Sequence, residues 1–182
     1  MSKKTFLRTI LAAAFLLLMA SGNSWAASIS WDGGAGDGLW GSAANWSGDV
    51  LPGPNDDVTI GASTVYLNVD ASIKSLTLST ATSFLYPYTS SSNTITLTGN
   101  LTFGNAGAAI VYNNGNGKLN LNFAGTAAQI VTLSADAVNA TPVGLNVYNI
   151  TVADNSSVTV SNNFSFNIYG DLTVNGTGTI TY

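Results

Sequence analysis

The chain has 182 residues with nine Asp, five basic residues and no Glu, His or Cys, for a formal net charge of −4. So few cations cannot neutralise many phosphates, which argues against nucleic acid, and poly-uronate substrates are disfavoured for the same electrostatic reason. Without cysteine there are no disulfides, so stability has to come from burial and backbone hydrogen bonding.

Residues 1–26 have the three parts of a secretory signal peptide. A basic start (KKTFLR) precedes the apolar run Ile10–Met19, which is too short to span a membrane, and Ser24-Trp25-Ala26 offers small residues at positions −3 and −1 of a cleavage site. We therefore expect a secreted, extracellular or cell-surface protein with no transmembrane span after cleavage. The mature chain keeps two Lys against nine Asp, a net charge of 2 − 9 = −7.

Residues 27–60 differ in composition from the rest and predict a loop-rich cap that leads into the first strand. The pattern is W-D-G-G-A-G-D-G-L-W, then N-W-S-G-D, then P-G-P-N-D-D-V-T-I. Closely spaced glycines favour tight or positive-φ backbone, and the two prolines bracket a turn before Val58–Ile60.

This segment resembles the N-terminal motif of secreted bacterial β-helix surface proteins, of autotransporter-passenger-like and adhesin-like type. Those proteins carry a W-x-G-G-x-G-D…W…N-W…P…D-x-V-x-I pattern ahead of strand repeats, and the matching stretch here covers about thirty residues. The resemblance implies a right-handed parallel β-helix at a cell surface. It implies no particular activity.

Alternating apolar and polar residues predict short strands through the rest of the chain and almost no α-helix. We expect strands at 58–60, 65–69, 73–78, 94–103, 108–112, 119–123, 130–133, 150–152, 158–160, 164–168, 172–174 and 180–182. Longer interruptions at 80–92 and 134–144 are expected to be loops that project from a corner.

Two internal shifts predict stacked coils. A shift of 22 residues places I-T-V-A-D-N-S-S-V-T-V, from Ile150, on L-T-V-N-G-T-G-T-I-T-Y, and a shift of 24 places Ile95 and Leu97 on Leu119 and Leu121. We therefore predict a right-handed parallel β-helix over 61–182, with coils of about 20 to 24 residues. An antiparallel β-sandwich is the alternative, because turn signals every eight to twelve residues also fit that fold.

The sequence predicts no catalytic residues and no cofactor, because the usual bases and nucleophiles are absent and only Asp is left for acid–base chemistry. Calcium is the one candidate metal, because it takes six to eight oxygen ligands and Asp carboxylates supply such oxygens. The candidate ligands are Asp32, Asp37, Asp49, Asp56 and Asp57. The competing expectation is that these carboxylates cap backbone amides in turns.

The aromatic residues can have either of two roles. They can stack on sugars, and the carbohydrate candidates are Trp31, Trp40, Trp46, Tyr86 and Tyr88. Alternatively the three tryptophans cover the open end of the solenoid, since a terminal repeat has to bury the core. We favour the covering role.

The predicted function is that of a structural or adhesive surface protein without catalytic activity, acting as a stalk, passenger segment or assembling subunit. Its expected partners are surface glycans or host and matrix surfaces, and a carbohydrate-binding module is the alternative. The strand at Ile180–Tyr182 ends in mid-pattern. We therefore expect the C-terminal end to be either truncated or a surface for self-association, since an open strand edge pairs readily with another chain.

Overall fold

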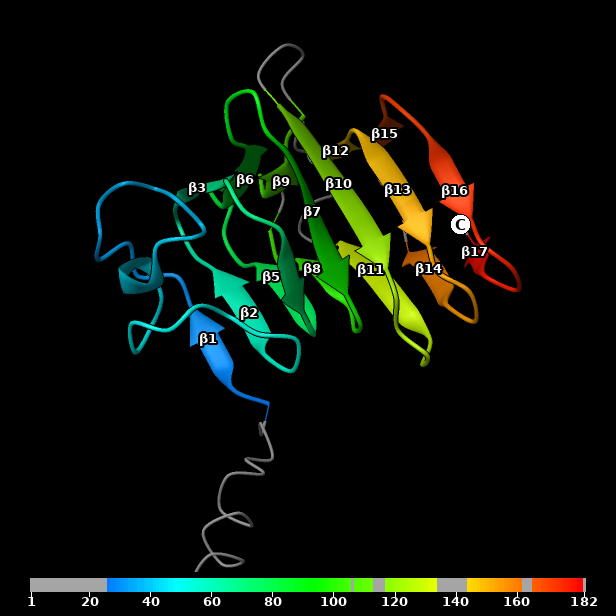
Figure 1. Cartoon of the computed structure of the whole chain (residues 1–182), viewed down its shortest axis with the longest axis horizontal. Helices are drawn as coiled ribbons and strands as arrows, with labels where there is room; N and C mark the ends of the chain where they lie inside the picture. The colour runs from blue at the N-terminus through cyan, green and yellow to red at the C-terminus, as the bar shows by residue number, and fades with distance from the viewer. Residues whose placement is uncertain (1–25, 106, 113–116, 134–143, 162–164, 182) are drawn as a thin grey trace, which may run out of the picture.

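The computed structural model describes residues 26–105, 107–112, 117–133, 144–161 and 165–181. Its strands form three parallel sheets that run side by side along the long axis of the molecule (Figure 1). The first sheet holds β1 (Ser28–Ser30), β2 (Asp57–Ile60), β5 (Ser75–Leu78), β8 (Leu101–Phe103), β11 (Gln129–Leu133), β14 (Ser157–Ser161) and β17 (Thr179–Thr181). The second holds β3 (Thr64–Leu67), β6 (Phe84–Pro87), β9 (Ala109–Ile110), β12 (Gly144–Val147) and β15 (Ser165–Ile168). The third holds β4 (Ala71–Ile73), β7 (Ser92–Leu97), β10 (Lys118–Phe123), β13 (Asn149–Val152) and β16 (Leu172–Val174).

Each coil takes one strand from each sheet in chain order, starting with β2, β3 and β4. This order repeats through β16, and β17 then returns to the first sheet. Because every strand pairs in parallel with its equivalent in the next coil, the fold is a right-handed parallel β-helix, as predicted, and the sandwich alternative is wrong. A short 3₁₀ helix at Ala43–Asn45 is the only helix among the described residues, and none of them forms a helix suited to crossing a bilayer.

The 22-residue shift is confirmed as the register of the last two coils. Ile150 pairs with Leu172, and Val158 pairs with Ile180. The 24-residue shift is wrong by two positions, because Ile95 pairs with Leu121. Side chains alternate between faces with a period of two, so both shifts place apolar residues on the core face, and the hydrophobic pattern alone cannot separate them.

Two of the expected strands turn a corner and contribute to two sheets. The expected strand 73–78 is divided at Lys74 into β4 and β5, and the expected strand 94–103 is divided into β7 and β8. The first corner is one residue long and contains no Gly or Pro, so the sequence gives no signal of it. The second contains Gly99-Asn100, a turn signal that the continuous strand interpretation passed over.

The expected loop 80–92 is also wrong in part, because β6 lies within it. Pro87 ends that strand, and a proline lowers the expectation of a strand because it donates no ladder hydrogen bond. The other expected loop spans 134–144. Residues 134–143 lie outside the described residues, and Gly144 is the first residue of β12.

Coil length varies more than predicted. Val58 pairs with Leu76, a step of 76 − 58 = 18 residues, whereas Ile110 pairs with Leu145, a step of 145 − 110 = 35 residues. The paired strands keep their register despite this difference in step length.

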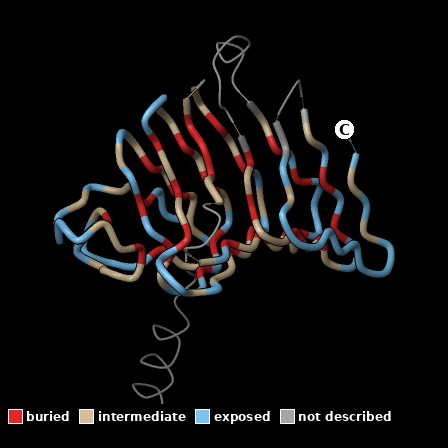
Figure 2. The backbone as a smooth tube through the Cα atoms, turned by 90° about the horizontal axis from the view of Figure 1, so that it is seen from above, coloured by how far each residue is buried: buried red, intermediate tan, exposed pale blue. Residues whose placement is uncertain are grey.

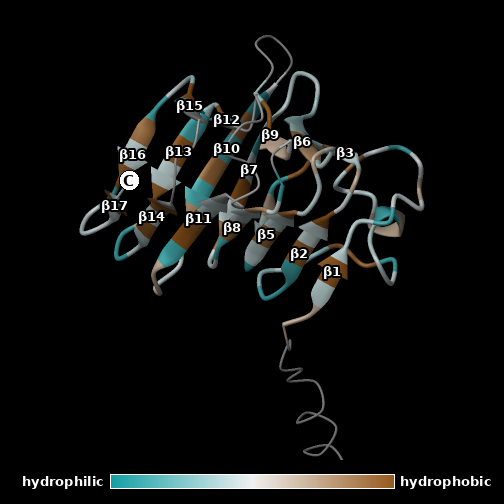
Figure 3. Cartoon of the chain, turned by 180° about the vertical axis from the view of Figure 1, so that it is seen from behind, coloured by the Kyte–Doolittle hydropathy of each residue, from teal (hydrophilic) through white to brown (hydrophobic). Residues whose placement is uncertain are grey.

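The core is a set of apolar columns inside the coils (Figure 2). Alternate residues of each strand point inward, so in-register pairing stacks like on like. One column of the first sheet contains Val58, Leu76, Leu101, Val131 and Val160. Figure 3 shows hydrophobic and hydrophilic segments following one another along several strands, β11 among them.

Polar side chains at the corners tie successive coils together. The side-chain oxygens of Asp70, Asn100 and Asn149 accept hydrogen bonds of 2.8 Å from the amides of Thr94, Ile130 and Asp171, respectively. Gln129 is buried and donates to the carbonyl oxygens of Leu97 and Gly99 in the preceding coil. These bonds satisfy backbone groups that the turn leaves without a ladder partner.

Candidate functional site

The tryptophans of the lead-in form a plug at the N-terminal end of the solenoid. Trp46 is 0% exposed and Trp40 is 2% exposed, and the ring of Trp46 packs edge-on against Trp31 and Trp40 with centroids 4.9 and 4.7 Å away. The indole nitrogen of Trp46 donates to the carbonyl oxygen of Trp40 at 2.8 Å. Trp40 and Trp46 therefore have no ring face to offer a sugar, and Trp31 is half-buried.

The lead-in is attached to the first coil along two sheets. β1 pairs with β2 in the first sheet, and Leu39 forms a parallel bridge with Tyr66 of the second sheet. The loop between them lies beside the first coil at the end opposite β17 (Figure 1). This placement covers the first layer of the core.

Asn45 holds the loop of the lead-in together. Its side chain is fully buried, accepts a hydrogen bond from the Ala35 amide at 2.9 Å, and donates to Asp37 at 2.6 Å and to the Leu39 carbonyl at 3.0 Å. Gly34 is required beside it, because a Cβ at that position would lie 2.4 Å from the Ala44 carbonyl oxygen. The N-W and G-G elements of the motif are thus explained by the packing of the plug.

The five candidate calcium ligands lie in the turns of the lead-in or, for Asp57, at the start of β2. Asp32 accepts from the Gly34 amide, and Asp56 accepts from the amides of Ala27 and Gly53. Asp49 adopts a positive φ of 55°. Among the described residues no three acidic side chains are grouped so that they could share a metal ion.

Asp37 and Asp57 each accept hydrogen bonds from side chains that lower their pKa. A hydrogen bond from Ser42, with others from the Leu39 amide and Asn45, holds the pKa of Asp37 below its usual 3.8. Asp57 accepts from Lys74 at 2.8 Å and from Ser75, and the Lys74 bond is the main cause that lowers the pKa of Asp57. A lowered pKa keeps both carboxyls ionised, which is the opposite of what a general acid needs.

Further along the chain, Asp154 joins the turns of two successive coils. It accepts from the amide and the hydroxyl of Thr177 at 2.8 and 3.0 Å, and these bonds lower its pKa.

Tyr86 and Tyr88, the remaining carbohydrate candidates, differ in exposure. Tyr86 is half-buried on the outer face of the second sheet, with its ring centroid 5.9 Å from Tyr66 and 6.2 Å from Phe84. Tyr88 follows β6 and is exposed. Of the five aromatic candidates, Tyr88 therefore presents the most accessible ring.

A second aromatic group, which we name the tyrosine corner, was not predicted. It consists of Tyr112, Tyr148 and Tyr169, which follow β9, β12 and β15 where the chain leaves the second sheet. The centroid of Tyr112 lies 5.6 Å from that of Tyr148 and 4.6 Å from that of Tyr169, and Tyr169 is 54% exposed. The repeat of N-V-Y at 146–148 as N-I-Y at 167–169 is the signal that could have revealed it.

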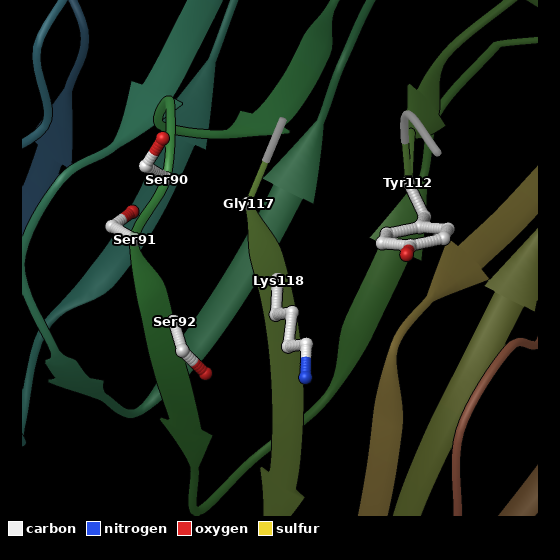
Figure 4. A pocket seen from close by; sticks show the side chains of 6 residues that line it. All are labelled: Ser90, Ser91, Ser92, Tyr112, Gly117 and Lys118. Atoms are coloured by element: carbon white, nitrogen blue, oxygen red, sulfur yellow. The ribbon is translucent and has the colours of Figure 1, made fainter. Parts of the chain in front are cut away.

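Lys118, at the start of β10, lies against the tyrosine corner. Its ammonium nitrogen is 4.1 Å from the centroid of the Tyr148 ring, a cation–π contact. Beside it is an open pocket of about 380 Å³, lined by Ser90, Ser91, Ser92, Tyr112, Gly117 and Lys118. Figure 4 shows Ser92 and Lys118 on neighbouring strands, with the Tyr112 ring across from Lys118.

Gly117 fixes the backbone at this pocket. Its φ is +119°, and a Cβ would lie 2.1 Å from the Tyr88 carbonyl oxygen, so no other residue fits without a shift of the chain. The next amide, that of Lys118, donates to the Ser91 carbonyl at 2.7 Å. The turn before β7 and the start of β10 are therefore held in contact.

A second trough, of about 550 Å³, lies over the corner between the third and first sheets. Half of its lining residues carry hydroxyl or amide side chains, among them Ser75, Thr77, Asn100 and Thr102. Its cation, Lys74, is already paired with Asp57.

Comparisons of the chain with protein-family models, with curated proteins and with solved structures find no match.

Proposed function

We propose that this protein is a secreted or cell-surface β-helix that acts as a structural and adhesive module. The observation that carries the proposal is the in-register stack of coils, closed at one end by the tryptophan plug and displaying exposed tyrosines at one corner. A stack of this kind is a stiff support, because each coil is hydrogen-bonded to both neighbours, and its corners can vary without disturbing the core.

The carboxylates support a non-catalytic role. Asp37, Asp57 and Asp154 accept hydrogen bonds that hold parts of the fold together, and their pKa values are lowered.

The signal peptide and the adhesion can be tested together. We expect a bacterial host that exports the full chain to release a protein whose N-terminus is Ala27, as read by mass spectrometry. Purified exported protein should then bind surfaces coated with polysaccharide or extracellular matrix in a surface plasmon resonance assay. Retention of residues 1–26, or no binding to any coated surface, would remove the support for an adhesive surface protein.

A carbohydrate-binding module is the second candidate, and the exposed rings of Tyr88 and Tyr169 favour it. Aromatic faces next to hydroxyl groups suit sugar rings, which combine apolar C–H faces with hydroxyls. Because all three mature tryptophans belong to the plug, sugar should leave tryptophan fluorescence unchanged while it shifts tyrosine resonances in NMR spectra. A tryptophan response to sugar would instead place binding at the lead-in.

A further inference from the structure

We infer that the pocket at Lys118 binds the acidic group of a saccharide that carries an isolated carboxylate, with the sugar ring against the tyrosine corner. This inference rests on the adhesive function proposed above and names the ligand class for it.

The first step is charge. Lys118 and Lys74 are the only basic side chains after residue 26. Lys74 is neutralised by Asp57 at 2.8 Å, whereas Lys118 has no carboxylate within ion-pair distance among the described residues. The Tyr148 ring holds the ammonium in place and leaves its charge available to a ligand, because a ring attracts a cation without neutralising it.

The second step is the surface beside that charge. Tyr169 is more than half exposed, and its ring packs against that of Tyr112 with the centroids 4.6 Å apart and the planes tilted by 41°. A ring held in this way loses little conformational freedom when a ligand packs on it. The exposed face therefore suits the C–H face of a pyranose.

The third step is the hydroxyl rim of the pocket. Ser90, Ser91 and Ser92 lie on the turn and strand facing Lys118 (Figure 4). The Ser91 hydroxyl donates to the Tyr88 carbonyl at 2.9 Å, so its oxygen keeps lone pairs that can accept a hydrogen bond from a ligand. Serine hydroxyls of this kind recognise sugar hydroxyls.

The overall charge limits the ligand to few acidic groups. A mature chain of net charge −7, calculated as 2 − 9, repels a polyanion, and a single ammonium compensates a single carboxylate. The expected ligand is thus a largely neutral glycan with isolated uronic acids, which is consistent with the disfavoured poly-uronates.

The test compares two disaccharides that differ by one group, cellobiouronic acid and cellobiose, titrated into the exported protein by NMR. A charge-assisted hydrogen bond predicts about tenfold tighter binding of the acid. Lys118→Gln should reduce the affinity for the acid to that for cellobiose, Lys118→Arg should retain most of the preference, and Lys74→Gln, the matched control, should leave it unchanged. Tyr169→Leu should weaken both sugars several-fold, whereas Tyr66→Leu should weaken neither.

Equal affinity for the two sugars, or equal losses in Lys118→Gln and Lys74→Gln, would overturn the inference. Unchanged melting temperatures would show that the variants are folded. The coated-surface assay separates the two claims: if Lys118→Gln still adheres fully, adhesion stands and the assigned pocket is wrong. If the wild-type protein binds no coated surface, the proposed function itself fails.

Discussion

Asn45 is the residue on which the plug depends most directly. Its amide is fully buried and makes three side-chain hydrogen bonds, to the Ala35 amide, to Asp37 and to the Leu39 carbonyl. No apolar residue could replace these bonds. The asparagine of the N-W motif is therefore a structural residue, although it also fits an N-x-S sequon.

We expect Asn45→Ala to lower the free energy of unfolding by roughly 2 to 3 kcal/mol, because it removes a fully buried amide side chain together with its three hydrogen bonds to Ala35, Asp37 and Leu39. Urea unfolding followed by tryptophan fluorescence measures this directly, since Trp31, Trp40 and Trp46 lie in the plug. Asn175→Ala, the same change at an exposed turn, is the control and should lie within about 0.5 kcal/mol of wild type. Equal effects of the two changes would contradict the role of Asn45.

The lowered pKa values of Asp37 and Asp57 predict how stability depends on pH. Their folded pKa values lie below the usual 3.8, so the unfolded chain binds more protons as the pH approaches that value. The stabilisation is present above about pH 4 and is lost as the pH falls through the folded values. The urea midpoint should therefore be lower at about pH 3 than at about pH 6.

Asp57→Asn provides the check on this pH dependence. The variant should lose part of the difference between the two midpoints, because residue 57 then no longer titrates. A wild-type midpoint that does not change between the two pH values would show that these hydrogen bonds contribute little.

At the scale of the strand, the sequence predicts the outer and inner faces well and predicts the corners poorly. The alternation of apolar residues identified most strands, and the 22-residue repeat placed β13 against β16 correctly. The corner at Lys74 could not be predicted, because one ordinary residue suffices to turn the chain between two sheets. β6 lies inside the expected loop 80–92, and its last residue, Pro87, is a residue type that weakens a strand signal.

The candidate site was predicted only in part, because local sequence does not show which strand ends meet in space. The tryptophan plug was anticipated, because large aromatic side chains next to a solenoid end have a core to cover. The tyrosine corner depends on which strand ends meet in space. Tyr112 and Tyr148 are 36 residues apart, calculated as 148 − 112, so no local pattern joins them.

The register of β7 and β10 can be tested by cross-linking. Thr96 pairs directly with Asn122, so Thr96→Cys with Asn122→Cys should form a disulfide on mild oxidation, because paired Cα atoms of adjacent strands lie about 4.8 Å apart. Thr96→Cys with Asn120→Cys, on the same face but two residues away, would span roughly 8 Å and should stay reduced. Efficient cross-linking of the second pair alone would support the 24-residue register.

At the scale of the whole molecule, the two ends of the described solenoid differ. The N-terminal end is covered by the plug, whereas Leu172 and Val174 of β16 are 48% and 42% exposed. β15, β16 and β17 each pair on one side only within the described residues. Open edges beside apolar side chains favour pairing with another chain.

We therefore predict concentration-dependent self-association through this end, measured by sedimentation velocity on the exported protein. The double variant Leu172→Lys, Val174→Lys should shift the protein toward monomer, because charges on the edge oppose strand pairing. Tyr66→Lys, at an exposed residue of β3 in the second sheet, is the matched surface control. A wild-type protein that stays monomeric at high concentration would refute the prediction.

The variable corners have a practical consequence for design. Steps between equivalent residues range from 18 to 35 while the strands stay in register, so chain length at a corner is uncoupled from the core. Ala127 and Ala128 lie exposed at one such corner, between β10 and β11. We expect that a foreign peptide inserted there would leave every strand pair unchanged. The fold could therefore serve as a rigid scaffold that displays inserted loops.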